Sequence, residues 1–272
     1  MGRPLRKRTL RLPVSDLTPE DAMEAVHHAL SSLGRGLPSP VGLGIAFSAH
    51  VDYAGRITSP SYGWTDVDPV SYLETEIPVA VSTGVGAMAG SELTSSPLSL
   101  ERDPLASTLY VYARELVGHA WIVGNAVHQP YTGSAPTAFN DIAGSGSFSA
   151  RHGHPLGSTA VLETARQRGL NVSTVPDLVG LAELNPVARG ILDERAELLS
   201  QIISLAVDVV DPSTVVFAGE TFTADPGTVR IIAEGLRGTG RQLSIQRAGD
   251  GILSRAAAVT ALHRLWQDPL GV

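Results

Sequence analysis

The stretch "IPVAVSTGVGAMAG", residues 77–90, has the pattern of a strand, a polar turn and the start of a helix. A short apolar run, Ile77 to Val81, leads into Ser82, Thr83 and Gly84, and a small-residue segment follows. A turn between a strand and a helix N-terminus is a common place for a bound anion or a catalytic carboxylate. This turn carries two hydroxyls and no acid. The stretch therefore predicts the shape of a site without the group that would perform acid–base chemistry.

Strands and helices are expected to alternate along the rest of the chain, which favours an α/β fold with a mostly parallel sheet. The longest expected irregular stretch is 128–157, which is rich in Gly, Ser, Pro and His. It is open whether this is a functional loop or a plain surface loop. A hairpin is expected within 51–64. Further helices are expected at 18–34, 157–169, 185–212, 226–238 and 252–266, and strands at 8–14, 40–48, 107–115, 118–127, 213–220 and 241–248.

Composition excludes several classes of function. The 272 residues carry a net charge of -7, which argues against a broad nucleic-acid footprint. There are no cysteines, so disulfides and thiolate metal sites are excluded. The only lysine is Lys7, which rules out a Walker A loop. The basic N-terminus lacks an apolar segment and no apolar run is long enough to span a bilayer, so we expect a cytoplasmic protein without a membrane partner.

Several segments, in order, resemble one family of proteins. "VGLGIAFSAHVDYAGRITSPSYGW", "AVSTGVGAMAG", "DVVDPSTVVFAGE" and "ILSRAAAVTALHRLWQDPLG" are similar to segments of ROK proteins, the group of repressors, open reading frames and sugar kinases. The resemblance covers nearly the whole chain. It implies the two-lobed, ribonuclease H-like fold of sugar kinases, Hsp70 and actin. The expected lobes are a partial N-terminal one, 1–106, and a C-terminal one, 107–272.

The chain departs from the family's kinases at the positions that carry chemistry. Thr83 stands where the resemblance implies the aspartate that removes a proton from the sugar, and a hydroxyl is no base near neutral pH. Ala113, Arg114 and Glu115 occupy a Gly-Thr-Gly phosphate turn, and the Glu115 charge disfavours nucleotide. We therefore expect no catalytic residue, and Mg-ATP only if the chain is a kinase after all. The family's cysteine-rich zinc segment has no counterpart, so no zinc is expected.

Family members open with an Asp-Gly-Gly-Thr strand, and regulators place a winged helix-turn-helix before it. Neither is present in this sequence. We expect either that the gene starts upstream or that the lobe is repaired in another way, such as dimerisation. DNA would then be bound only through a domain absent from this chain, and the resemblance implies a homodimer.

Candidate ligand-binding residues each have a plainer structural interpretation. Asp141 can replace a sugar-binding glutamate of the family, but Gly144 falls where its histidine should be, and a turn or helix cap is the favoured explanation of Asn140 and Asp141. Trp64 can stack on a sugar or fill a core. The remaining ligand candidates are Ser82, Thr83, His152 and His154, and the remnant of a nucleotide cleft is Gly219 and Glu220. A small basic patch consists of Arg3, Arg6, Lys7, Arg8 and Arg11. This patch is more simply explained as a solvated strand.

Three hypotheses of function follow. The first is a non-catalytic, regulator-like domain that senses a sugar or sugar phosphate. The second is a divergent, glucokinase-like sugar kinase that uses Asp141 as its base. The third is a ligand-free dimerisation scaffold.

Overall fold

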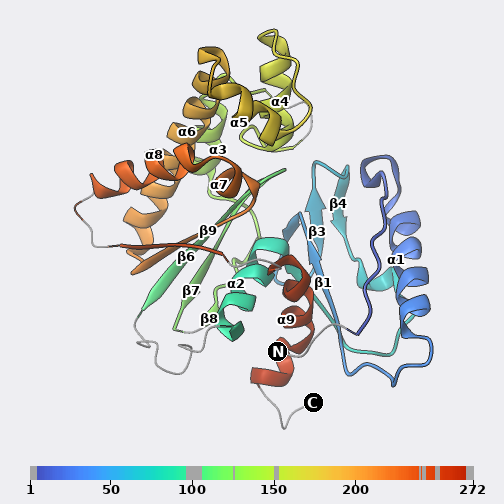
Figure 1. Ribbon diagram of the computed structural model, residues 1–272. Coiled ribbons are helices and arrows are strands. Elements are labelled where there is room, and N and C mark those ends of the chain that lie inside the picture. The colour runs from blue at the N-terminus through green and yellow to red at the C-terminus, as the bar shows by residue number, and fades with distance from the viewer. Residues whose placement is uncertain are drawn as a thin grey trace. The chain divides into compact units, whose positions relative to one another are not determined.

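The computed structural model describes residues 5–95, 106–124, 126–149, 153–238, 240, 243–248 and 252–267. The chain forms two compact units (Figure 1). Unit 1 contains residues 1–100, 129–134 and 251–272, and unit 2 contains residues 101–128 and 135–250. In the part of the chain that is described, no helix has the length and apolar character needed to cross a membrane.

A two-stranded parallel sheet lies at the centre of unit 1. Strand β1 (Leu43–Phe47) pairs in register with β5 (Val79–Thr83), so Phe47 and Thr83 end at the same edge. Helix α2 (Gly84–Ser95) follows β5 directly. Helix α9 (Ile252–Gln267) packs on β1 so closely that a Cβ atom at Gly44 would lie 2.0 Å from the carbonyl oxygen of Ala257. Glycine at position 44 therefore allows the C-terminal helix to approach this sheet.

The second part of unit 1 is an antiparallel meander that packs against helix α1 (Pro19–Gly34). Its three strands are β2 (His50–Val51), β3 (Ile57–Ser59) and β4 (Trp64–Val67). Trp64 is 4% exposed and shares a small core with Ala22 and Ile57. Its indole donates to the carbonyl of Leu17. Trp64 is thus a core residue and offers no exposed face to a sugar.

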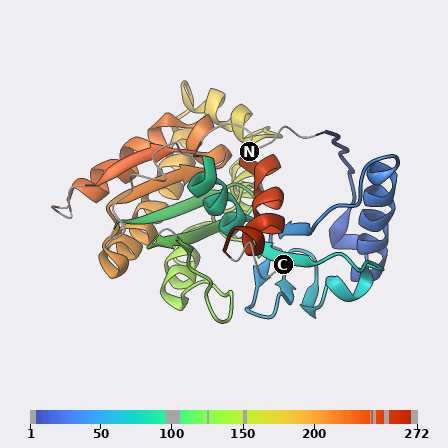
Figure 2. The same cartoon turned by 90° about the horizontal axis from the view of Figure 1, so that it is seen from below.

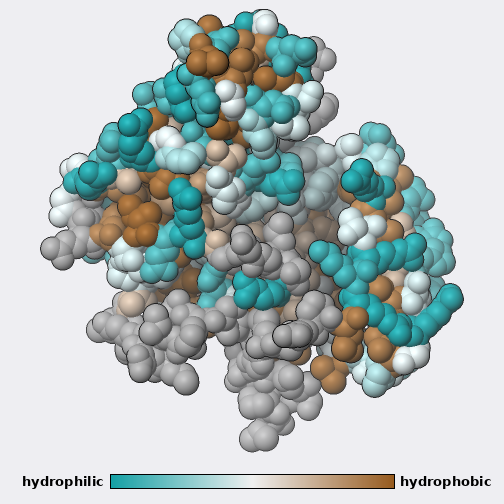
Figure 3. Space-filling model, viewed as in Figure 1, coloured by the Kyte–Doolittle hydropathy of each residue, from teal (hydrophilic) through white to brown (hydrophobic). Residues whose placement is uncertain are grey.

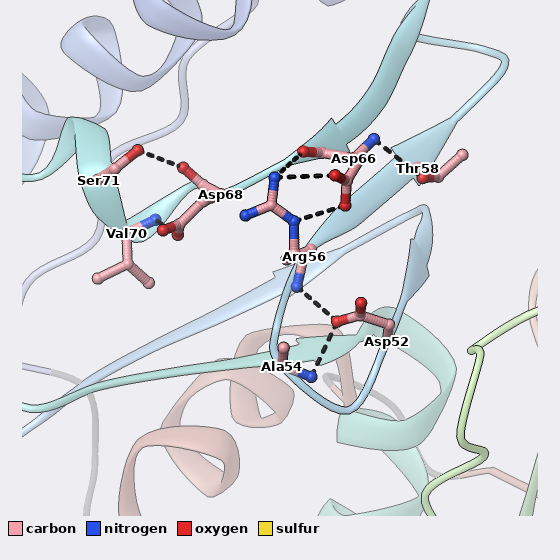
Figure 4. Close-up of polar contacts among 8 residues, drawn as sticks. All are labelled: Asp52, Ala54, Arg56, Thr58, Asp66, Asp68, Val70 and Ser71. Carbon is pink, nitrogen blue, oxygen red and sulfur yellow. Dashed lines mark hydrogen bonds and ion pairs between the residues drawn. The ribbon is translucent and has the colours of Figure 1, made fainter.

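Aspartates stabilise the turns of this meander (Figure 4). The carboxylate of Asp52 accepts the backbone N–H groups of Ala54 and Arg56, both at 2.9 Å. The Arg56 guanidinium in turn binds both the carboxylate and the carbonyl of Asp66. Asp68 accepts the N–H of Val70 at the start of the 3-10 turn Val70–Tyr72. These groups are turn caps and an exposed ion pair, so they define the hairpin and not a binding site.

Unit 2 is built on a five-stranded mixed sheet in the order β10-β9-β6-β7-β8. The inner strands β6 and β9 are parallel, and β7 and β8 continue the sheet as antiparallel neighbours. The carboxyl ends of β6 and β9 therefore meet at one edge. The strands are β6 (Ser107–Ala113), β7 (Val117–Val123), β8 (Ala126–Val127), β9 (Thr214–Ala218) and β10 (Ser244–Arg247).

The helices of unit 2 enclose its core against this sheet (Figures 1 and 2). They are α3 (Thr137–Gly144), α4 (Ser158–Gln167), α5 (Val175–Ala182), α6 (Pro186–Val210), α7 (Glu220–Ala224) and α8 (Pro226–Arg237). The long α6 begins at Asn185, whose side chain accepts the N–H groups of Val187 and Ala188. The end of unit 2 that carries α4 and α5 also presents hydrophobic surface (Figure 3), and Leu184, between α5 and α6, is 94% exposed.

Three expectations about the fold were wrong. Residues 5–13 form no strand, because the described part of unit 1 supplies no partner strand to complete its hydrogen bonds. The stretch 128–157 contains the helix α3, whose N-cap residue Pro136 provides no side-chain cap. The single boundary expected between 106 and 107 differs from the observed division, since α9 and residues 129–134 belong to unit 1.

Candidate functional site

The first candidate site is the edge of unit 1 where β5 ends. The hydroxyl of Thr83 accepts the backbone N–H of Gly86 at 3.0 Å and so caps the first turn of α2. The Ser82 hydroxyl donates to the carbonyl oxygen of Thr83 at 3.2 Å. Both side chains are half-buried. Neither of them is a carboxylate, so the turn can orient a ligand through hydrogen bonds but cannot take a proton from it.

The second candidate site is the edge of unit 2 where β6 and β9 end. Gly219 follows β9 with a φ of 99°, and a Cβ atom there would lie 2.4 Å from the carbonyl oxygen of Ala113. Gly157, just before α4, makes a similar approach to the carbonyl oxygen of Glu115, at 2.1 Å. Three segments far apart in sequence therefore meet at backbone distance, and only glycine allows this at positions 157 and 219.

The backbone groups of Arg114, in the middle of the Ala113–Glu115 turn, are occupied by protein partners. The N–H of Arg114 donates to the carbonyl of Leu116 at 3.0 Å. The carbonyl of Arg114 accepts both the N–H and the hydroxyl of Ser158, at 2.7 and 3.0 Å. A phosphate-binding turn needs N–H groups that point to the ligand. The Glu115 carboxylate lies 3.1 Å from the Arg114 guanidinium and so offsets the positive charge that could attract a phosphate to this turn.

Buried charge underlies this edge. Arg195, on α6, is 1% exposed, and its Nε donates to the carbonyl of Leu156 at 2.9 Å. In the described part of the chain its Nη2 atom has no hydrogen-bond partner. Burial lowers the pKa of Arg195 to about 10, while the carboxylates of Glu220 and Asp225 act in the opposite direction. The guanidinium therefore stays charged at neutral pH and holds the residue that precedes Gly157.

A third candidate site is a cavity inside unit 2, beneath α3. Its polar lining consists of His119, Asn140 and His154, and the rest of its wall is apolar. Burial lowers the pKa of His119 to about 4, so the imidazole is neutral at pH 7. His154 accepts the N–H of Leu156 at Nδ1, which leaves the proton of its neutral form on Nε2. Two predicted ligand residues, Asn140 and His154, thus lie on one cavity although the cavity itself was not predicted.

The other predicted site residues are placed as follows. Asp141 is exposed on α3 and is not part of the cavity wall. Gly219 and Glu220 form the β9–α7 turn beside Ala113, and His152 lies outside the described residues. Arg6 donates to the carbonyls of Leu33 and Arg35, at 2.8 and 2.6 Å, so the described part of the basic segment is partly tied to unit 1. Arg3 also lies outside the described residues.

The residues present do not fit the zinc site that the family resemblance implies. The segment after α3 contributes Phe148, Leu156 and Val161 to the apolar core. Throughout the ranges that the structure covers, no three His, Asp or Glu side chains lie close enough together to hold a metal ion. Apolar packing thus occupies this part of unit 2, and no step of the proposed function involves zinc.

Sequence reasoning missed Arg195 and His119. The signal for Arg195 was an arginine one turn after Ile191 and Leu192 and one turn before Leu198 and Leu199, on the apolar stripe of a long helix, "ILDERAELLSQII". His119 stands in a strand between Val117 and Trp121 at alternate positions, which all face the same side of the sheet as the buried Val111. A polar residue on a core face of a strand is such a signal.

The chain is similar to curated transcriptional regulators from Mycobacterium bovis and Mycobacterium tuberculosis. Each is 30% identical over 256 residues, which cover 84% of this chain and 57% of the relative. The chain thus spans a little over half the length of the curated relatives it matches. No family model matches the sequence.

Solved structures show the same arrangement of elements. A ROK hexokinase from Thermus thermophilus aligns with a TM-score of 0.70 at 20% identity, over 91% of this chain and 88% of the hexokinase. The fold is that of ROK proteins. A ROK transcriptional regulator, described as a homologue of the E. coli MLC protein, aligns with a TM-score of 0.67 at 14% identity, over 89% of this chain and 67% of the regulator.

A ROK protein from Streptococcus pneumoniae was solved in complex with sucrose. It aligns with a TM-score of 0.66 at 14% identity, over 98% of this chain and 92% of the relative. The resemblance read from the ordered sequence segments is therefore confirmed for the fold. The ROK fold occurs in both kinases and regulators, so the residues of the site must distinguish between them.

Proposed function

We propose that this chain is the ligand-sensing region of a ROK transcriptional regulator, and that it binds a sugar or sugar phosphate without phosphorylating it. The observation that carries the proposal is the turn after β5, where the hydroxyl of Thr83 caps α2 and no carboxylate is present. A sugar kinase needs a base that removes the proton from the attacking hydroxyl. A sensor needs only hydrogen bonds, which Ser82 and Thr83 can supply.

The second support is the Ala113–Glu115 turn of unit 2. The N–H and carbonyl of Arg114 are engaged by Leu116 and Ser158, and the Glu115 carboxylate offsets the Arg114 charge that could attract phosphate. Weak or absent binding of Mg-ATP is therefore expected. The name of the curated relatives, transcriptional regulator, agrees with this reasoning. DNA would be recognised by a part of the protein outside this chain, and a homodimer would carry a change in one subunit to the other.

Isothermal titration calorimetry tests the proposal directly. The chain is titrated with Mg-ATP and, separately, with hexoses, N-acetylhexosamines and their phosphates. The expected result is binding of at least one sugar or sugar phosphate and no binding of Mg-ATP. Removing both hydroxyls, with Ser82→Ala and Thr83→Val, should abolish the sugar signal, whereas Ser15→Ala, at an exposed position far along the chain, should leave it unchanged. Light scattering on the same samples measures the oligomeric state.

The kinase alternative is favoured by one observation, the structural similarity to the Thermus hexokinase. Asp141 is then the nearest candidate base, although it lies exposed on α3. Transfer of phosphate from ATP to a sugar, abolished by Asp141→Asn, would replace the sensor proposal with this one. Failure of every sugar, sugar phosphate and nucleotide to bind would leave the dimerisation scaffold as the better account.

A further inference from the structure

The cavity beneath α3 has a wall that favours an uncharged ligand. Most of its surface is aliphatic, and none of the residues that line it is acidic, lysine or arginine. Its floor comes from strands β6 and β7 and from helix α6, and its cover comes from Ala135, Phe139 and Asn140 at the start of α3. A charged ligand would lose its hydration here without gaining a partner charge.

The side chain of His119 in this wall has unused hydrogen-bonding capacity. The imidazole of His119 contacts Trp121 and Phe139 edge-on, with ring centroids 5.4 and 5.2 Å apart. These two contacts fix the orientation of the ring. Nothing in the part of the chain that is described hydrogen-bonds its nitrogens. A neutral imidazole has one N–H donor and one nitrogen acceptor, and a hydroxyl group can pair with either.

We propose that this cavity binds a short, uncharged alcohol, with its hydroxyl on the His119 imidazole and its alkyl chain against β6 and α6. The proposal is independent of the sugar-sensing function, because a sugar carries too many hydroxyls for this apolar wall. It does not use the turns at Thr83 or Glu115.

The size of the cavity limits the length of the alcohol that can bind. The free volume is about 20 Å³, enough for roughly one ordered water molecule. Longer alcohols need α3 to move, and the structure favours such movement at its N-terminal end. Pro136 gives that end no side-chain cap, whereas the segment after α3 is held to α6 by two hydrogen bonds from Ser147 to Glu194, at 2.7 and 2.8 Å. We therefore expect methanol to enter with little change, and 1-propanol and 1-butanol to displace the first turn of α3.

The experiment is an NMR titration of the full chain with methanol, ethanol, 1-propanol and 1-butanol, and with xenon as an apolar probe. Saturable shifts are expected for the amides and methyl groups of Leu109, Val111 and Ile203. Ala206→Val, which fills the cavity from α6, should abolish them for all probes. Ala233→Val on α8, away from the cavity wall, is the matched control and should bind as the natural sequence does.

The His119→Phe variant separates the polar contact from the apolar one. It keeps an aromatic ring between Trp121 and Phe139 but removes both nitrogens. Affinity for the alcohols should fall by about fivefold, the loss of one neutral hydrogen bond, while xenon binding persists. Shifts that rise linearly without saturation, or equal alcohol binding by Ala206→Val, overturn the site. Unchanged alcohol affinity in His119→Phe overturns the role of the imidazole.

Discussion

The half-buried imidazole of His119 should make the stability of unit 2 depend on pH. Burial lowers the pKa of His119 to about 4, whereas a histidine in an unfolded chain titrates near about 6.5. As the pH falls, the unfolded chain takes up the proton first. The stabilisation is therefore fully present above about pH 6.5 and is lost progressively between about pH 6.5 and about pH 4.

The expected loss follows from the two pKa values. It amounts to about 2 kcal/mol of unfolding free energy at about pH 5 and approaches roughly 3 kcal/mol below about pH 4. Urea unfolding of the natural sequence and of His119→Phe, each at about pH 7.5 and about pH 5, measures it. Carboxylates titrate in both proteins, so the difference between them isolates His119. No residue of the cavity wall is a carboxylate that would obscure the comparison.

The control is Ser15→Ala, because Ser15 is exposed and carries no titratable side chain in this pH range. It should lose as much free energy between the two pH values as the natural sequence loses. If His119→Phe also loses that amount, burial does not hold the imidazole neutral, and the wall around His119 does not exclude water from the ring.

Three further predictions concern the turns and the buried charge. Gly219→Ala should lower the unfolding free energy by about 3 kcal/mol, because of its φ of 99° and its contact with Ala113. The thermal unfolding midpoint should then fall by roughly 6–12 °C. Gly190→Ala, on α6 with free space around it, should instead raise the midpoint slightly. Thr83→Ala should cost about 1 kcal/mol in urea unfolding through loss of the α2 cap, and Thr83→Ser should restore it; equal stability of the two would contradict the capping role. Arg195→Met should be more stable than Arg195→Ala by about 2 kcal/mol in guanidinium unfolding, since both remove the buried charge but methionine fills most of the cavity that alanine leaves; the reverse order would mean that the site cannot pack an apolar side chain of this length.

Local signals in the sequence determined several elements. Thr18 caps α1 by accepting the N–H of Asp21, as the Thr-Pro-Glu-Asp pattern predicts. Asn185 and Pro186 set the start of α6 in the same way. The strands expected at 107–115 and 118–127 formed, and β6 and β7 pair along their length. Caps, short connections and apolar runs act between residues close in sequence, so their outcome does not depend on the rest of the fold.

The tertiary structure decided the features that depend on distant partners. The expected strand at 8–14 did not form, because a strand is stable only beside another strand. The C-terminal helix belongs to unit 1 because Gly44, far earlier in the sequence, lets its backbone approach β1. The cavity brings His119, Asn140 and His154 together from a strand, a helix and a loop. The sequence by itself determined which turns lack a catalytic acid, and only packing decided which of the remaining polar groups share a site, since burial and proximity are properties of the assembled core.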